Sequence, residues 1–140
     1  MSRVFLDTSA YSAFKRGHPQ LRYRIREASQ IQLNSVVLGE LRAGFLQGTR
    51  FRENLAELAQ FLDSPRVAVF AVDEETAARY AVIFDPLRRA GSPIPTNDVW
   101  IAAGAMQHGS VLLTTDPHFR LVSQVVVEIF EPHLNRPKQG

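Results

Sequence analysis

The chain has 140 residues, of which 45% are hydrophobic and 21% are charged, and its formal net charge is +2 at pH 7. This length and composition are typical of one folded domain and fit poorly with a disordered chain, a collagen-like fibre or a coiled coil. With no cysteine in the chain, disulfides, thiolate metal sites and cysteine nucleophiles are excluded. We expect one domain over residues 1–131 and a frayed tail over residues 132–140. Apolar runs are too short to span a bilayer, so we expect a soluble cytoplasmic protein with no membrane partner.

Short apolar runs alternate with segments of helical periodicity in the first half of the chain. Strands are predicted at 4–6 and 31–33, and helices at 9–16, 19–28 and 50–62. A further helix carries the sequence VVLGEL, and we predict Ser35 as its N-cap, because a hydroxyl there can accept a free backbone N–H. The helix over 50–62 has one apolar stripe, as a helix that packs on a core requires.

The second half of the chain continues this alternation. Strands are predicted at 67–72, 111–114 and 125–129, with helices from Asp73 to 89 and from Asn97 or Asp98 to about 107. Pro86 lies within the first of these helices and predicts a kink or a split, because proline removes a backbone hydrogen bond. Strands that alternate with helices favour parallel pairing. We therefore expect an α/β fold, a three-layer α/β/α sandwich around a mostly parallel sheet of four to five strands.

Several nucleotide and hydrolase motifs are missing from the sequence. The first predicted strand continues into LDTSAY, where a dinucleotide site would need a glycine-rich turn. The sequence also has no P-loop, no Gly-x-Ser-x-Gly elbow and no His-Glu-x-x-His motif. These absences disfavour four large classes of enzyme.

Four acidic residues lie where a parallel sheet would bring them together. Asp7 and Asp116 each close a predicted strand, Glu40 lies in the helix after the second strand, and Asp98 lies at the start of a helix. The carboxyl ends of parallel strands meet at one edge, which is where such sheets bind ligands. Clustered carboxylates raise one another's pKa or bind a cation, and oxygen ligands favour Mg²⁺ or Mn²⁺. Such an ion supports phosphodiester hydrolysis by activating water.

Each of these residues also has an ordinary structural interpretation. Asp7 and Asp116 can be turn residues, Asp98 a helix N-cap and Glu40 a solvated helix residue. The functional hypothesis depends on all four occurring together. His118 follows Asp116 by two residues, and we interpret it as structural. The excess of arginine over lysine, 14 to 2, suits phosphate binding but is also typical of a genome rich in G and C.

Four motifs in order resemble the PIN-domain family, and within it the VapC-like toxins of bacterial type II toxin–antitoxin pairs. They are LDTS at 6–9, SVVLGELRAG at 35–44, PTNDVWIAA at 95–103 and TTDPHF at 114–119. The resemblance spans nearly the whole chain. It departs from the family at Trp100, where an aliphatic residue is commoner, and at Pro86, which interrupts a helix that is usually continuous.

This resemblance implies an endoribonuclease that depends on Mg²⁺, with Mn²⁺ as a possible substitute, and whose catalytic residues are Asp7, Glu40, Asp98 and Asp116. Our hypothesis is that the three aspartates hold the metal while Glu40 orients or deprotonates the attacking water. The resemblance also implies supporting roles for Ser9 and Thr115, a homodimer, an RNA substrate of the tRNA or rRNA class, and a cognate antitoxin that blocks the cleft. Surface arginines are candidates for holding the RNA backbone, with a solvated helix face as the alternative: Arg42, Arg88, Arg89 and Arg120.

Two other functions are compatible with parts of the sequence. A phosphatase of the haloacid dehalogenase type would need a second aspartate two residues after Asp7, and position 9 is serine. A non-catalytic module that binds RNA or protein is the other alternative. Four clustered acids argue against it, because a scaffold gains nothing from mutual repulsion.

Overall fold

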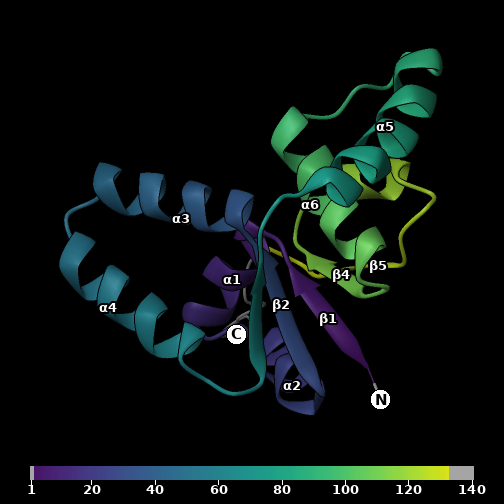
Figure 1. Ribbon diagram of the computed structural model, residues 1–140. Coiled ribbons are helices and arrows are strands. Elements are labelled where there is room, and N and C mark those ends of the chain that lie inside the picture. The colour runs from purple at the N-terminus through teal and green to yellow at the C-terminus, as the bar shows by residue number, and fades with distance from the viewer. Residues whose placement is uncertain (1, 133–140) are drawn as a thin grey trace, which may run out of the picture.

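The computed structural model describes residues 2–132 and contains a five-stranded sheet with helices on both faces (Figure 1). Its strands are β1 (Arg3–Leu6), β2 (Gln30–Asn34), β3 (Val67–Phe70), β4 (Val111–Thr114) and β5 (Val127–Ile129). Its helices are α1 (Thr8–Lys15), α2 (Pro19–Glu27), α3 (Ser35–Gln47), α4 (Phe51–Leu62), α5 (Glu74–Arg89) and α6 (Thr96–Gln107), with a short 3₁₀ helix η1 (Pro117–Leu121). Within residues 2–132, no helix is long and apolar enough to cross a membrane.

The sheet is parallel throughout and has the strand order β3-β2-β1-β4-β5. The chain therefore starts at the central strand, moves outward to β3, and then crosses back to the other side of β1. The direction of winding reverses between β1 and β4, and a ligand site is expected at the carboxyl ends of these two strands. The predicted α/β fold with a parallel sheet is confirmed.

The helices divide between the two faces of the sheet. Right-handed crossovers place α1 to α4 on one face and α5 and α6 on the other, an arrangement that can be followed in Figure 1. The α6 helix lies directly on the centre of the sheet, because a Cβ added at Gly104 would come within 2.8 Å of the Phe5 ring and 2.9 Å of the Asn34 amide. The α3 and α4 helices lie side by side and extend away from the sheet (Figure 1).

Several predicted boundaries differ from the structure. The N-cap of α3 is Asn34 rather than Ser35, because the Asn34 side chain accepts the backbone N–H groups of Val36 and Val37. Helix α6 begins one or two residues before the predicted start, at Thr96, directly after Pro95. Strand β3 ends at Phe70, opposite the last residue of β2, and β5 begins at 127, so both edge strands are shorter than the apolar runs predicted. Of the predicted frayed tail, residues 133–140 lie outside the described residues.

The predicted split at Pro86 is wrong, because α5 runs without a break from Glu74 to Arg89. Proline at this position cannot donate to the carbonyl of Val82, four residues earlier. The side-chain amide of Gln124 donates to that carbonyl instead, at 3.3 Å. The structure thus replaces the backbone hydrogen bond that the proline removes.

Candidate active site

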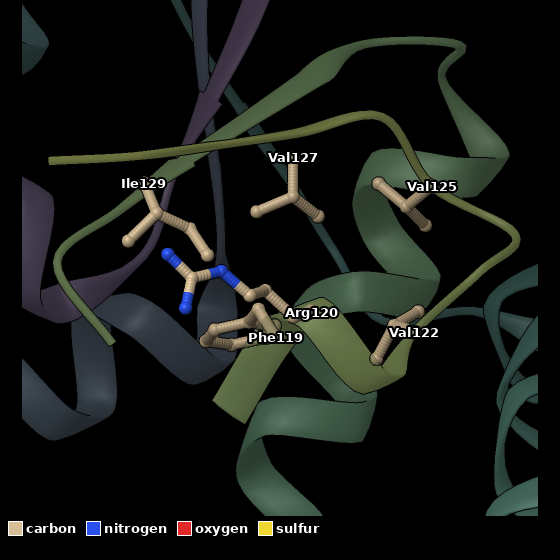
Figure 2. Close-up of a pocket in the computed structure, with 6 residues that line it drawn as sticks. All are labelled: Phe119, Arg120, Val122, Val125, Val127 and Ile129. Atoms are coloured by element: carbon tan, nitrogen blue, oxygen red, sulfur yellow. The ribbon is translucent and has the colours of Figure 1, made fainter. Parts of the chain in front are cut away.

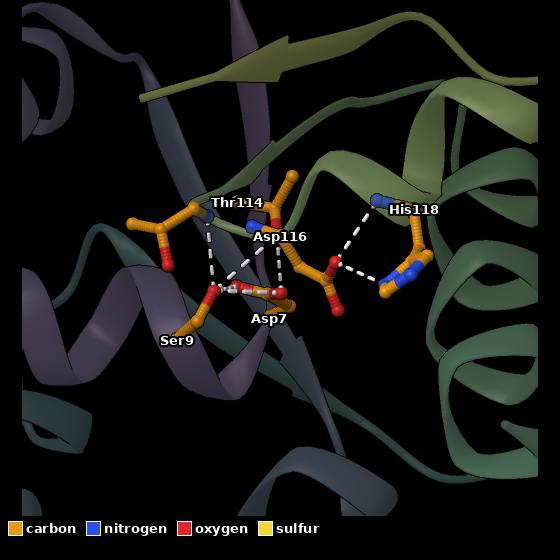
Figure 3. Close-up of polar contacts among 6 residues, drawn as sticks. Asp7, Ser9, Thr114, Asp116 and His118 are labelled. Carbon is orange, nitrogen blue, oxygen red and sulfur yellow. Dashed lines mark hydrogen bonds and ion pairs between the residues drawn. The ribbon is translucent and has the colours of Figure 1, made fainter. Parts of the chain in front are cut away.

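Asp7 lies at the carboxyl end of β1, where it caps α1 and is almost completely buried. Its carboxylate accepts a backbone N–H from Ala10 at 2.8 Å, the Ser9 hydroxyl at 2.7 Å and the Thr114 hydroxyl at 2.5 Å (Figure 3). Burial raises the pKa of Asp7, the three hydrogen bonds oppose this effect, and the charge of Asp116 adds to it. The ends of β1 and β4 are therefore joined through one buried carboxylate.

Glu40 lies on α3 and faces the start of α1. Its carboxylate accepts the Thr8 hydroxyl at 2.6 Å and, more weakly, the Asn97 side-chain amide at 3.4 Å. Thr8 follows Asp7 directly, and Asn97 precedes Asp98 directly. Three segments that are far apart in sequence thus converge on the Glu40 carboxylate.

Asp116 follows β4 and caps the 3₁₀ helix η1. Its carboxylate accepts the backbone N–H of His118 at 2.9 Å and lies 2.8 Å from Nδ1 of the same residue (Figure 3). Its own backbone N–H donates to the Thr114 hydroxyl at 2.9 Å, so Thr114 links Asp116 to Asp7. His118 is largely exposed and makes the ring contact through Nδ1, which leaves the other ring nitrogen facing away from Asp116.

Asp98 lies in the first turn of α6, and the charges of the other three acids affect its pKa. Its pKa is raised from 3.8 to about 6, first by burial and then by the charges of Asp116, Glu40 and Asp7, while His118 opposes the effect. Hydrogen bonds relate the four positions: Thr114 links Asp7 to Asp116, and Glu40 accepts from the sequence neighbours of Asp7 and Asp98. The structure thus brings together the four acids that the sequence predicted at the carboxyl edge of the sheet, and we refer to them as the acid cluster.

The donor set of the acid cluster suits a hard divalent cation. All its ligands would be carboxylate oxygens, which Mg²⁺ and Mn²⁺ prefer. Within residues 2–132, no lysine or arginine forms an ion pair with any of the four, and His118 beside Asp116 is the one basic side chain in contact with them. In the same range, no group of three or more His, Asp or Glu side chains is placed so that it could hold a metal ion. The charge and chemistry therefore fit a cation, and binding would require the carboxylates to draw closer.

The arginines predicted to contact RNA occupy separate places. Arg88 and Arg89 both pair with Asp85 on the surface of α5, and Arg42 is exposed on α3. Arg120 lines a pocket of about 390 Å³ between η1 and β5. Figure 2 shows its guanidinium among the apolar side chains of that pocket, whose lining contains none of the four acids.

Three residues that contact the acid cluster were not singled out from the sequence: Thr8, Asn97 and Thr114. Each is adjacent in sequence to one of the acids or two residues from it and lies in one of the four quoted motifs, and these are the signals that could have found them. Of the two predicted supporting residues, Ser9 donates to Asp7, whereas Thr115 contributes its backbone N–H to the Ser9 hydroxyl at 3.0 Å. The threonine side chain on Asp7 is that of Thr114.

The model of the PIN domain matches residues 4–125, a range that includes all four acids. The chain belongs to the PIN-domain family. The predicted resemblance is confirmed.

The chain is also similar to a named ribonuclease and to solved structures. The chain is 35% identical over 92 residues to Ribonuclease VapC4 of Mycobacterium tuberculosis, covering 66% of this chain and 71% of that protein. A DNA-bound VapBC crystal structure from Salmonella typhimurium is 26% identical, with a TM-score of 0.77 over 92% of this chain and 98% of that one. VapBC-5 of M. tuberculosis, a member of the VapBC family of toxin–antitoxin systems, is 25% identical, with a TM-score of 0.69 over 92% and 98% of the two chains.

Proposed function

We propose that this PIN-domain protein is a metal-dependent endoribonuclease and the toxin of a toxin–antitoxin pair. The observation that carries the proposal is the acid cluster at the winding reversal of the sheet, where burial and then the charges of the other three acids raise the pKa of Asp98. The ribonuclease and VapBC relatives support the same class of activity.

Asp7, Asp98 and Asp116 would hold the divalent cation, with Mg²⁺ preferred and Mn²⁺ able to replace it. Such an ion, when bound, neutralises charge on the phosphate and lowers the pKa of water. Ser9 and Thr114 fix the Asp7 carboxylate, and His118 fixes that of Asp116. Preorganised side chains of this kind need little rearrangement as charge develops on the phosphate.

Glu40 orients the attacking water and accepts its proton. Its carboxylate is held by Thr8 and Asn97, so one oxygen lone pair can face the water in a fixed direction. The water oxygen bonds to phosphorus while the bond to the 3′ oxygen breaks. The products are one RNA end with a 5′-phosphate and one with a 3′-hydroxyl.

The proposal includes partners as well as chemistry. We propose an RNA substrate of the tRNA or rRNA class, a cognate antitoxin and a homodimer, all acting in the cytoplasm where such RNA is found. The VapBC relatives support the antitoxin. The RNA substrate and the homodimer rest on the family resemblance of the four motifs.

Incubation of the purified protein with total bacterial RNA tests the proposed activity. Reactions contain Mg²⁺, Mn²⁺ or EDTA, and Asp98→Asn is run beside the parent chain. We expect new RNA ends with either metal, none with EDTA and none with the variant. Cuts that persist in EDTA, or that Asp98→Asn makes at the parent rate, would contradict a metal-dependent acid cluster.

A further inference from the structure

A second pocket with a strongly basic lining lies at the opposite end of α1 from Glu40. Its volume is about 370 Å³, and six residues line it: Phe14, Lys15, Arg22, Ile25, Arg26 and Arg66. We call this pocket the basic groove. Four of these six lining residues are cationic. None of the lining residues found within residues 2–132 is acidic. Helix α1 has eight residues, so the groove lies about 12 Å along the helix axis from Thr8.

Three of the four cations have no ion-pair partner within residues 2–132: Arg22, Arg26 and Arg66. Arg22 and Arg26 lie one turn apart on α2, where like charges at this spacing disfavour a helix. Arg24, on another face of the same helix, pairs with Glu128 at 3.0 Å. The protein therefore neutralises the arginine that faces the body of the fold and leaves uncompensated the two on α2 that line the basic groove.

The third arginine of the basic groove is held in place by the backbone. Nη1 of Arg66 donates to the carbonyls of Ile25, Arg26 and Ala28, at 3.3, 3.2 and 2.6 Å. These contacts fix the guanidinium at the end of α2 while its other two nitrogens make no hydrogen bond to residues 2–132. Lys15 completes the set and has only a long contact to Glu57, at 3.9 Å.

The basic groove adjoins a smaller pocket on α1. Lys15 borders a smaller pocket of about 180 Å³, which Tyr11 and Ser12 line as well. The Tyr11 hydroxyl is buried and has no hydrogen-bond partner in residues 2–132. Lys15 is the residue that the two pockets share, and the lining of the smaller pocket includes Glu57 but none of the four acids of the acid cluster.

We propose that the basic groove binds the phosphate backbone of single-stranded RNA, outside the active site. This inference rests on the proposed function and adds a second contact for the same substrate. Guanidinium groups bind phosphate oxygens through two parallel hydrogen bonds, which a fixed Arg66 and the uncompensated Arg22 and Arg26 can supply. Phe14 and Ile25 give the groove an apolar floor against which a base can pack. An RNA strand that continues along α1 from the cleavage point would reach it.

The test measures RNA binding without cleavage. A fluorescently labelled single-stranded RNA of mixed sequence, about 20 nucleotides long, is titrated with the protein in EDTA at several salt concentrations. The number of phosphate contacts sets how steeply the binding constant falls with salt. The variant is Arg22→Glu with Arg26→Glu. The matched control is Arg50→Glu with Arg52→Glu, which changes the net charge equally at the exposed start of α4.

We expect the groove variant to bind RNA about tenfold more weakly, with a salt slope smaller by about 1.4, as the loss of two phosphate contacts to a single strand predicts. The control should stay within about twofold of the parent chain, because its arginines lie outside the groove. A third variant, Arg22→Gln with Arg26→Gln, should show an intermediate loss and an unchanged melting temperature. Equal losses in the groove and control variants would overturn the proposal, as would unchanged binding by the groove variant.

A co-purification arm identifies a protein occupant of the basic groove. Unchanged RNA binding by the groove variant together with loss of its co-expressed antitoxin would overturn the proposal and assign the groove to an acidic protein segment. The arms also separate this inference from the proposed function. If the RNA is cleaved normally but its affinity does not depend on the groove arginines, only the inference is contradicted. If the RNA binds through the groove but is never cleaved, only the proposed function is contradicted.

Discussion

Replacing Asp98 with asparagine removes one charge from the acid cluster at almost constant volume. Burial and the charges of Asp116, Glu40 and Asp7 raise the pKa of Asp98 from 3.8 to about 6. The folded state therefore holds this proton more tightly than the unfolded chain, and the ionised carboxylate destabilises the fold above about pH 6. A difference of about two pKa units corresponds to about 3 kcal/mol, which solvent screening of this half-buried side chain reduces to about 1–2 kcal/mol.

Thermal melting of the metal-free proteins measures this destabilisation. At pH 7.5 in EDTA and low salt, we expect Asp98→Asn to melt about 3–8 °C above the parent chain. The advantage should shrink between pH 6 and pH 4, because the Asp98 carboxyl of the folded parent chain then takes up its proton and loses its charge. Added Mn²⁺ should stabilise the parent chain and leave the variant unchanged, since only a binding site shifts the unfolding equilibrium.

The exposed Asp63 provides the matched control, because Asp63→Asn makes the same chemical change at the end of α4. The Asp63→Asn control should have the melting temperature of the parent chain at pH 7.5 and at pH 4. An Asp98→Asn variant whose melting temperature at pH 7.5 equals or falls below that of the parent chain would refute the destabilisation by the Asp98 charge in the acid cluster. Equal stabilisation of parent and variant by Mn²⁺ would remove Asp98 from the metal site.

Further substitutions test the packing and the contacts of the site. Thr114→Val should lower the free energy of unfolding by about 1.5–3 kcal/mol, because it removes one of the three donors to the buried Asp7 carboxylate, while Thr115→Val should change it little; chemical denaturation checks both. Gly104→Ala should lower the free energy of unfolding by about 1–3 kcal/mol, because its Cβ overpacks against β1. Gly44→Ala, whose Cβ meets no atom within 4 Å, should leave the free energy of unfolding unchanged or raise it in the same assay. Glu40→Gln should lower the cleavage rate at least about 100-fold with an unchanged melting temperature, and a near-parent rate would exclude it as the proton acceptor.

The sequence predicts the centre of the fold better than its edges. Strands β1 and β4 are buried on both faces, so their apolar runs are continuous and end at Asp7 and close to Asp116. The edge strands β3 and β5 are shorter than their apolar runs because each extends only as far as the neighbouring strand pairs with it. When the neighbouring strand determines where a strand ends, the local hydrophobicity of the sequence cannot locate that end.

The proximity of Asp7 and Asp116 was predictable because it depends on the strand topology alone. Parallel pairing brings the carboxyl ends of β1 and β4 to one edge whatever the side-chain conformations are. The contacts that orient the acids depend on individual rotamers, and for this reason Thr114 rather than Thr115 holds Asp7. Similarly, Gln124 compensates for Pro86 across a separation of 38 residues, a contact with no signature in either segment.

The chemistry of the RNA ends tests the central claim most directly, because it reports which nucleophile attacks phosphorus. RNA cut in Mg²⁺ is ligated to adaptors that distinguish a 5′-phosphate from a 5′-hydroxyl, and a 3′-hydroxyl from a 2′,3′-cyclic phosphate. If water attacks at the acid cluster, every new cut carries a 5′-phosphate and a 3′-hydroxyl, and these ends disappear with Glu40→Gln and with EDTA. Cuts that carry a 5′-hydroxyl and a cyclic phosphate would mean attack by the RNA's own 2′-hydroxyl and would contradict the account.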